Sequence, residues 1–417
     1  MFLNRLIERN QNLIEFSIKL HRDRMIDPNT WVFDLDAIYH NARILTNSAR
    51  KYGLRTYVMT KQYARNPFIT QIGLHGGLDS TVAVDIQCAK EMRRYNIPVG
   101  HLGHLNQVPM REVDWVLGIR PEVITVYSVE AAKRISDAAQ RMGLVQDILM
   151  RPFKDSDIFF TGQEGGFPIE SFLESAKKIL EFPGVRIVGV TAFPCVSYNS
   201  KKADPVQATP NFYTIKEAAD LLRGLGVEVT QINAPGNTAS DTMPLLASMG
   251  ATHVEPGHGL LGTTPNQAFR EGIAEIPCYV LVSEVSHFYQ DRAYAFGGGL
   301  FMDIFDPDFP YEALVGATPQ AALNNRVRYI RKPVIIDYHA ELYPASRCAI
   351  GDTVVFGFRS QIQMTRSYIA LVAGLTKGNA RLVGIFDSRC TMLDANYDPV
   401  DSRKVIKMID EVLQEYN

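Results

Sequence analysis

The sequence predicts an α/β fold, namely a (β/α)8 TIM-like barrel followed by a C-terminal β domain. Eight short β-rich runs alternate with segments of helical periodicity between residues 56 and 261. Eight parallel strands close a barrel. After residue 275 the pattern changes to alternating β-branched and aromatic runs, which is typical of a β domain. We therefore expect an N-terminal helix at 1–30, a barrel at 31–275 and a β domain with a terminal helix at 276–417.

The N-terminal segment is expected to form one amphipathic helix. Charged residues recur every few positions between residues 1 and 25, so this segment is neither a signal peptide nor a membrane span. No later stretch is long and apolar enough to cross a membrane, and we expect a cytoplasmic protein. Residues 31–38 are expected to form a strand that precedes the barrel and could instead join the sheet of the β domain.

The eight expected barrel strands carry polar residues at their carboxyl ends. Barrel enzymes place their chemistry at that end, so we expect these residues to surround one site. The alternative for several of them is a structural role, such as capping a helix, as Ser128 is expected to do. The expected strands span residues 56–61, 81–86, 99–104, 123–128, 148–153, 187–193, 228–234 and 252–260. The polar residues are Lys61, Asp85, His101, His104, Tyr127, Arg151, Asn233, Glu255 and His258.

Five β-rich runs mark the expected β domain. They are rich in β-branched and aromatic residues, and turn-forming residues separate them. The runs span residues 278–285, 293–296, 334–337, 353–358 and 368–373.

Composition and charge favour a small-molecule partner. The chain has 43 basic and 45 acidic residues and a formal net charge of -2, without a long block of either sign. Nothing in this pattern suggests a nucleic-acid or membrane partner. The five cysteines are spread singly along the chain, which suits free thiols in a reducing compartment.

Lys61 is the first candidate for chemistry because it ends the first expected strand. A lysine taken alone is most often a solvated surface residue. At the mouth of a barrel, partly desolvated among apolar residues, it would lose its proton more readily and could form a Schiff base.

Two glycine-rich turns supply an expected phosphate site. Residues 233–239 (Asn-Ala-Pro-Gly-Asn-Thr-Ala) follow the seventh expected strand, and residues 255–259 (Glu-Pro-Gly-His-Gly) follow the eighth. Glycine lets the backbone approach a phosphate closely, and exposed N–H groups donate to it. The side chain of Asn237 or Thr238 can add a hydrogen bond. The alternative is that the glycines only shape tight turns.

With this lysine and these turns, residues 30–395 resemble the fold-type III pyridoxal-phosphate (PLP) enzymes, and most closely the YhfX group among them. The superfamily includes alanine racemase, D-serine dehydratase, D-threonine aldolase and the ornithine-decarboxylase type of decarboxylase. The resemblance implies that Lys61 holds the cofactor and that both turns bind its phosphate; Tyr63 lies near the position of a family tyrosine. The implied cofactor-binding residues are Lys61, Tyr63, Arg151, Gly236, Asn237, Thr238, Glu255, Gly257 and His258.

Glu255 is the most informative of these residues about mechanism. The resemblance implies that it faces the pyridine nitrogen of the cofactor, where a carboxylate keeps the nitrogen protonated and the ring strongly electron-withdrawing. Alanine racemase uses an arginine there, whereas Glu-Pro-Gly resembles the decarboxylases. A strong electron sink serves racemisation, decarboxylation, elimination and aldol cleavage alike. The alternative for Glu255 is a solvated acid beside a turn.

Two departures from the family pattern bear on the mechanism. The C-terminal part resembles that of D-serine dehydratase, and His339 matches a histidine there. The zinc-binding His-x-Cys of those enzymes is absent, because Ser360 and Ile362 stand at the corresponding positions, so we expect no metal. Ala192 stands where the family often has a histidine stacked on the cofactor ring.

Cys390 and His339 are the candidates for a second acid or base. Residues 387–394 (Asp-Ser-Arg-Cys-Thr-Met-Leu-Asp) resemble the loop that reaches the partner subunit's active site in racemases and decarboxylases of this fold. The alternative for Cys390 is a buried structural thiol, and for His339 a structural histidine.

These resemblances imply a homodimer with shared active sites that acts on a small amino acid or amine. The first choice is a racemase or epimerase, in which the substrate forms a Schiff base with PLP and Lys61 exchanges a Cα proton on one face, with Cys390 or His339 on the other. A decarboxylase is the next choice, followed by a D-amino-acid lyase or aldolase. The non-enzyme alternative is a PLP carrier protein. A barrel that binds a phosphorylated substrate at Lys61 without PLP also stays open.

Overall fold

The computed structural model forms two compact units, each assembled from separate stretches of chain. It describes residues 2–199, 205–303, 310–330 and 336–417. The barrel unit comprises residues 42–60 and 73–260, and the β unit comprises the chain up to residue 41 together with 61–72 and 261–417. The division differs from the expected domain boundaries, because residues 61–72, which follow the first barrel strand, pack with the β unit.

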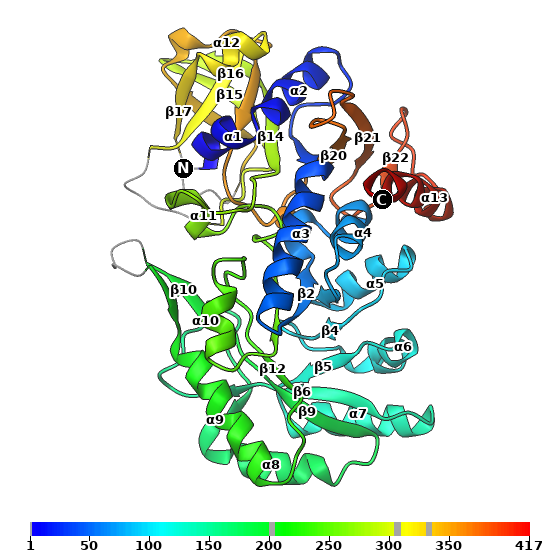
Figure 1. Cartoon of the computed structure of the whole chain (residues 1–417). Helices are drawn as coiled ribbons and strands as arrows, with labels where there is room; N and C mark the ends of the chain where they lie inside the picture. The colour runs from blue at the N-terminus through cyan, green and yellow to red at the C-terminus, as the bar shows by residue number, and fades with distance from the viewer. Residues whose placement is uncertain (1, 200–204, 304–309, 331–335) are drawn as a thin grey trace. The chain divides into compact units, whose positions relative to one another are not determined.

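The barrel unit contains the expected closed barrel of parallel strands (Figure 1). Each expected run overlaps one barrel strand, in the expected order, and the last strand pairs with the first where Val254 lies opposite Thr56. The strands are β2 (Arg55–Met59), β3 (Ser80–Ala83), β4 (His101–Leu102), β5 (Val123–Val126), β6 (Gln146–Met150), β9 (Val185–Thr191), β12 (Gln231–Asn233) and β13 (His253–Val254). Two short paired strands accompany them on each of two loops: β7 (Pro152–Phe153) with β8 (Phe167–Pro168), and β10 (Val196–Tyr198) with β11 (Val206–Ala208).

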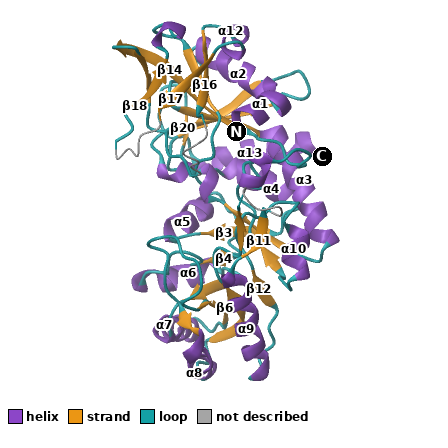
Figure 2. Ribbon diagram, turned by 90° about the vertical axis from the view of Figure 1, so that its left-hand side faces the viewer, coloured by secondary structure: helices purple, strands orange, loops and turns teal. Residues whose placement is uncertain are grey.

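Helices follow the barrel strands and surround them, as Figure 2 shows. Ser128 caps α7 as expected, since its hydroxyl accepts a hydrogen bond from the Ala131 N–H at 3.1 Å. Asp85 caps α5 through the Cys88 N–H at 2.7 Å, so it has the structural role that the sequence left open. The helices are α3 (Leu35–Lys51), α4 (Pro67–His75), α5 (Ile86–Arg94), α6 (Val113–Ile119), α7 (Val129–Arg141), α8 (Ile169–Leu180), α9 (Pro210–Gly224) and α10 (Met243–Ser248).

The β unit is built on a ten-stranded sheet in which an N-terminal strand lies between C-terminal strands. β1 (Thr30–Asp34) pairs antiparallel with β14 (Tyr279–Tyr289) and parallel with β20 (Tyr368–Ala373). In the expected run at 334–337, residues 334 and 335 lie outside the described residues, and the next described strand begins at His339. The other strands are β15 (Arg292–Phe296), β16 (Glu312–Gly316), β17 (Arg326–Ile330), β18 (His339–Tyr343), β19 (Thr353–Phe356), β21 (Arg381–Phe386) and β22 (Met392–Leu393).

The N-terminal segment forms two helices, α1 (Phe2–Arg9) and α2 (Gln11–Arg22), where the sequence predicts one. Asn10 interrupts the helix with φ −148°, because its side chain donates to Asp34 Oδ2 at 3.0 Å and to the Pro277 carbonyl at 3.1 Å. These tertiary bonds offset the loss of helical continuity. The later helices of the β unit are α11 (Pro265–Phe269), α12 (Pro319–Leu323) and α13 (Ser402–Leu413).

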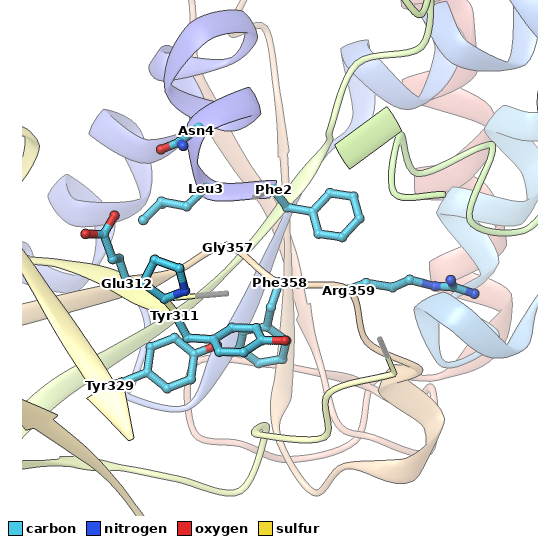
Figure 3. Close-up of a pocket in the computed structure, with 10 residues that line it drawn as sticks. Phe2, Leu3, Asn4, Tyr311, Glu312, Tyr329, Gly357, Phe358 and Arg359 are labelled. Carbon is cyan, nitrogen blue, oxygen red and sulfur yellow. The ribbon is translucent and has the colours of Figure 1, made fainter. Parts of the chain in front are cut away.

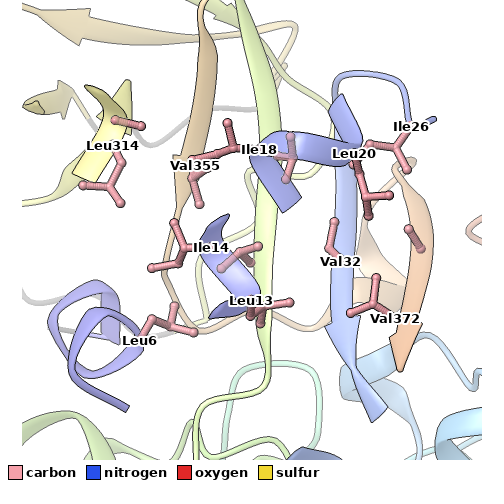
Figure 4. Close-up of a cluster of buried hydrophobic side chains, with 14 of the residues drawn as sticks. Leu6, Leu13, Ile14, Ile18, Leu20, Ile26, Val32, Leu314, Val355 and Val372 are labelled. Carbon is pink, nitrogen blue, oxygen red and sulfur yellow. The ribbon is translucent and has the colours of Figure 1, made fainter. Parts of the chain in front are cut away.

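The apolar faces of α1 and α2 cover the ten-stranded sheet. Leu13, Ile14 and Ile18 are fully buried against Val280 and Val355 in one cluster (Figure 4). Each such side chain contributes about 1.5–3 kcal/mol when it is removed from water. The N-terminal helices are therefore part of the core of the β unit. Among the described residues, no helix has both the length and the apolar character needed to cross a membrane.

Candidate active site

Lys61 begins a short 3-10 turn, η1 (Lys61–Tyr63), directly after the barrel strand β2. Its side chain is buried, with 8% of the residue exposed. Ala64 and Arg65 both have left-handed backbones, with φ 51° and 63°, which is rare for two consecutive residues that are not glycine. Asn66 then accepts hydrogen bonds from the first N–H groups of α4. Such left-handed conformations cost free energy and persist only where surrounding contacts fix them, here the hydrogen bonds to Asn66 and to the Arg65 carbonyl.

Cys390 lies against this same segment. Its thiol is fully buried and donates to the Arg65 carbonyl at 2.9 Å, and Arg65 Nη2 donates to the Ser388 carbonyl at 3.4 Å. Cys390 is itself left-handed, with φ 69°. The resemblance implies a loop that reaches a partner subunit, which a single chain does not test; within the chain, the thiol contacts Arg65. This contact places Cys390 beside the residues that follow Lys61.

His339 is solvent-exposed at the start of β18. Its ring lies 5.0 Å from that of His287 on β14 and 6.0 Å from that of Phe296 on the neighbouring strand β15, between centroids. Partial burial and the nearby His287 lower its pKa. These contacts make His339 a residue of the sheet surface, and none of those described joins it to Lys61 or Cys390.

Glu255 is the centre of a buried polar network at the carboxyl ends of the barrel strands. Its Oε1 accepts hydrogen bonds from His101 Nδ1 and from Asn233 Nδ2, both at 2.6 Å. His101 Nε2 lies 2.5 Å from the hydroxyl of Thr125. Glu255 Oε2 has no hydrogen-bond partner, although His104 Nε2 forms an ion-pair contact with it at 3.7 Å. The structure thus brings together three residues that the sequence singled out on separate strands.

The network keeps Glu255 ionised. Burial alone would raise the pKa of this carboxyl group, but the charges of His104 and His101 and the hydrogen bonds from His101 and Asn233 outweigh burial and lower its pKa to about 2. Glu255 is therefore a buried carboxylate that accepts two hydrogen bonds at Oε1 and none at Oε2. This differs from the solvated acid that the sequence left as the alternative.

The two glycine-rich turns pack directly against each other. A Cβ at Gly259 would lie 2.1 Å from the Thr238 carbonyl, and one at Gly236, which has φ 128°, would lie 3.1 Å from the Cys195 N–H nitrogen. Thr238 is buried, and its hydroxyl has no hydrogen-bond partner. The side chain of Asn237 donates to a backbone carbonyl. The turns therefore form a close backbone cradle that contains an unsatisfied hydroxyl, which a ligand oxygen could satisfy.

The second turn ends next to the first barrel strand. The Met59 N–H donates to the Pro256 carbonyl at 2.9 Å, and Gly257 and His258 are buried. Since Lys61 follows Met59 by two residues in the chain, covalent geometry alone keeps the lysine backbone within about 8 Å of this pairing.

Arg151 and Tyr63 occupy different environments. Arg151 is 1% exposed at the end of β6, where its guanidinium lies over the Tyr127 ring and donates to the hydroxyl of that ring and to the Gln163 carbonyl at 2.8 Å. No carboxylate pairs with it among the described residues. Tyr63 is fully buried, and its hydroxyl accepts from Thr70 at 3.3 Å. Tyr63 thus packs inside the β unit, while Arg151 is a buried cation at the site end of the barrel.

Comparison with known proteins identifies the family. Residues 33–265 match the family model for the N-terminal domain of alanine racemase, and residues 280–382 match the model for the YhfX-like C-terminal domain. The chain is 36% identical over 399 residues to the uncharacterized protein YhfX of Escherichia coli K12, an alignment that covers 95% of this chain and 100% of the relative. The chain belongs to the YhfX-like family. This places it in the fold-type III PLP superfamily, as the sequence resemblance indicates.

Solved structures share the fold of this YhfX-like chain. D-threonine aldolase from Filomicrobium marinum superposes with a TM-score of 0.62 at 15% identity, covering 87% of this chain and 95% of that one. D-threo-3-hydroxyaspartate dehydratase from Delftia sp. HT23 gives 0.63 at 14%, covering 86% and 97%. Alanine racemase of Clostridium difficile 630, in complex with cycloserine, gives 0.62 at 14%, covering 87% and 98%. At these identities the likeness shows the fold alone.

One cluster in this YhfX-like barrel has the composition of a metal site. Ligand atoms of His101, His104 and Glu255 all lie within 4.8 Å of one another. In this arrangement, however, both nitrogens of His101 are engaged, one with Glu255 and the other with Thr125, so neither lone pair points to a metal. The groups are therefore arranged as a hydrogen-bonded network.

Neither of two other features of the β unit offers a cofactor site. Ser360 and Ile362, which the sequence resemblance aligns with the zinc ligands of D-serine dehydratase, are fully buried. A cavity between the start of α1, Tyr311 and Tyr329 has a volume of about 20 Å³ (Figure 3), which is enough for one water molecule. None of the five cysteines is in a disulfide, as the sequence predicts.

Sequence reasoning missed Thr125, whose hydroxyl lies 2.5 Å from His101 Nε2. Its position in the alternating run 123–128 places it on the inner face of the barrel, because every second residue of a strand points the same way. A polar side chain at an inward position was the available signal.

Proposed function

We propose that this chain binds PLP through Lys61 and catalyses proton exchange at Cα of a small amino acid, as a racemase or epimerase. One observation carries the proposal. Glu255 is a buried carboxylate whose Oε2 has no hydrogen-bond partner, although its other oxygen has two. A buried acceptor left open costs about 1–3 kcal/mol unless a ligand donor meets it. The protonated ring nitrogen of PLP is such a donor.

The residues at the barrel end fit the rest of the cofactor. The Thr238 hydroxyl is buried without a partner, and a phosphate oxygen would satisfy it. Gly236 and Gly257 lack a Cβ that would hinder approach of the phosphate to the backbone, and Asn237 and His258 belong to the same turns. When bound, PLP supplies an electron sink for the bond that breaks at Cα.

Three side chains would have separate roles in the reaction. Lys61 provides the amine that attaches the cofactor and then holds or returns a proton at Cα. Glu255 keeps the proton on the ring nitrogen. Arg151, a buried cation without a carboxylate partner among the described residues, fits a carboxylate of the substrate.

For the acid or base on the second face we retain Cys390 and not His339. The Cys390 thiol contacts the segment that carries Lys61, whereas His339 is exposed on the sheet. The shared active sites of a homodimer remain part of this proposal, as does a cytoplasmic location, which the scattered thiols favour.

Decarboxylation is the second candidate, and a lyase or aldolase reaction is the third. Glu255 favours decarboxylation, because the sequence resemblance implies a carboxylate there in decarboxylases and an arginine in alanine racemase. The relatives of known fold, which include an aldolase and a dehydratase by name, leave these reactions open.

The first experiment is the visible spectrum of the purified protein with PLP, for wild type and Lys61→Ala. We expect a band in wild type that the substitution abolishes, and borohydride should fix the cofactor to the Lys61 peptide. A wild type that takes up no PLP would contradict the proposal and favour a barrel that binds a phosphorylated substrate.

Products then separate the reactions. With amino acids in deuterated water, a racemase gives both enantiomers labelled at Cα, a decarboxylase releases carbon dioxide and an aldolase releases an aldehyde. PLP uptake without turnover of any amino acid tested would instead favour a carrier protein.

A further inference from the structure

We propose that His101, supported by Thr125, is a positioning residue that binds Oε1 of Glu255 and so reserves Oε2 for the ring nitrogen of the cofactor. This inference rests on the proposed function, because it concerns the orientation of the carboxylate that faces PLP. It adds a residue on another barrel strand that touches neither cofactor nor substrate.

The asymmetry of the carboxylate is the first argument. Two donors, His101 Nδ1 and Asn233 Nδ2, converge on Oε1 at 2.6 Å each, and none is bonded to Oε2. Rotation of the carboxylate about its Cγ–Cδ bond would break both hydrogen bonds. Hydrogen bonds to a charged acceptor are stronger than those between neutral groups, so the orientation with Oε2 open is favoured.

The surroundings of His101 are the second argument. The ring is fully buried, and its other nitrogen lies 2.5 Å from the Thr125 hydroxyl. A hydroxyl can accept or donate, so Nε2 is satisfied whether or not it carries a hydrogen. In both cases the hydrogen on Nδ1 points to Glu255. Thr125 therefore fixes the orientation of the imidazole, which in turn fixes the carboxylate.

Two converging donors also favour the ionised form of Glu255. A protonated Oε1 would present a hydrogen to His101 and would accept poorly from Asn233, whose amide nitrogen lies 3.1 Å from His101 Nδ1. Without His101, the buried carboxylate would retain Asn233 as a hydrogen-bond donor and the ion-pair contact of Oε2 with His104 Nε2 at 3.7 Å. Loss of one hydrogen bond and one neighbouring charge raises the pKa of a buried carboxyl group and favours its protonated form. The ring nitrogen would then lose the charge that keeps it protonated.

The test compares side chains at position 101 in the PLP-loaded protein. His101→Leu removes the donor, and His101→Asn keeps an N–H near the position of Nδ1. His253→Asn is the matched control, because His253 is a partly buried histidine of the barrel whose Nδ1 contacts Thr252 instead. Glu255→Gln marks the result expected when the carboxylate is lost.

The readout is the ¹⁵N chemical shift of the ring nitrogen in ¹⁵N-labelled PLP. We expect the shift of a protonated nitrogen in wild type, His101→Asn and His253→Asn, and a move toward the unprotonated value in His101→Leu and Glu255→Gln. A protonated nitrogen in His101→Leu, with an unprotonated one in Glu255→Gln, would overturn the role of His101 and leave the proposed function intact. Equal shifts in wild type and Glu255→Gln would instead contradict the assignment of Glu255 to the ring.

A second readout does not depend on the cofactor. The infrared spectrum of apo His101→Leu should gain the band of a protonated carboxyl group, and this band should disappear in the double variant with Glu255→Gln. Should His101→Leu fail to fold, Thr125→Val removes the supporting hydroxyl at nearly constant volume and should move the ¹⁵N shift in the same direction by a smaller amount. An unchanged shift in Thr125→Val would contradict the proposed support by Thr125.

Discussion

Glu255 makes the stability of the protein depend on pH in a defined direction. Its pKa falls from the ordinary 4.5 to about 2 on folding, so the unfolded chain binds the proton more readily between these values. The stabilisation is fully present above about pH 4.5 and is lost as the pH falls through about 2. The expected loss is roughly 3 kcal/mol, measured as the change in the difference between wild type and Glu255→Gln in urea unfolding. A difference independent of pH over this range would contradict a lowered pKa.

Cys390 combines a structural contact with a proposed chemical role, and two substitutions separate them. Cys390→Ala removes the hydrogen bond to the Arg65 carbonyl and should lower the free energy of unfolding by about 1 kcal/mol. Cys390→Ser keeps a donor and should retain the stability of wild type. A hydroxyl is a far weaker acid than a thiol, so both variants should lose proton exchange on one face of Cα. Exchange at the wild-type rate in Cys390→Ser would remove Cys390 from the chemistry.

The two turns at the barrel end act as one element, because the backbone of one occupies the space beside the glycine of the other. Gly259→Ala would place a Cβ 2.1 Å from the Thr238 carbonyl and force the turns apart. We expect a loss of PLP affinity of at least tenfold, which corresponds to about 1.4 kcal/mol, measured by fluorescence titration. Gly224→Ala at the end of α9 is the control, since no atom lies within 4 Å of its added Cβ. Equal PLP affinities in Gly259→Ala and Gly224→Ala would contradict the proposal that the two packed turns bind the cofactor.

The helix α2 stabilises the β unit through its buried face. Ile14 is fully buried in the cluster with Val280 and Val355, whereas Lys19 on the same helix is exposed. Ile14→Asp would bury a charge without a partner and should unfold the β unit at ordinary temperature. Lys19→Asp should change the free energy of unfolding by less than about 0.5 kcal/mol. Circular dichroism melting curves compare the stability of the two variants. Similar curves would show that the buried face of α2 does not stabilise the β unit.

At the scale of the whole molecule, local patterns predicted the fold and non-local contacts escaped prediction. All eight barrel strands were found because each is a short local run that pairs with its neighbours along the chain. The break at Asn10 was missed because it depends on Asp34 and Pro277, which are distant in sequence. Strands β16, β17, β18, β21 and β22 lie outside the expected runs. β17 (Arg-Val-Arg-Tyr-Ile) alternates polar and apolar residues, so its signal was present in the sequence but was not used.

The site was predicted in part for the same reason. Strand ends identified Lys61, His101, Asn233 and Glu255, but the pairing of His101 with Glu255 depends on the geometry of barrel closure, which brings β4, β12 and β13 together around one interior. No sequence pattern predicts which way the loop of Cys390 turns. Its contact with Arg65 became visible only in the structure.

The place of β1 in the sheet has a consequence for biosynthesis. Its partners β14 and β20 leave the ribosome only after the entire barrel has been translated. Until then β1 has no strand to pair with, although its residues Trp31, Val32 and Phe33 are fully buried in the folded protein. The nascent chain must therefore shield an aggregation-prone segment during most of translation, a task suited to chaperones or to the preceding helices.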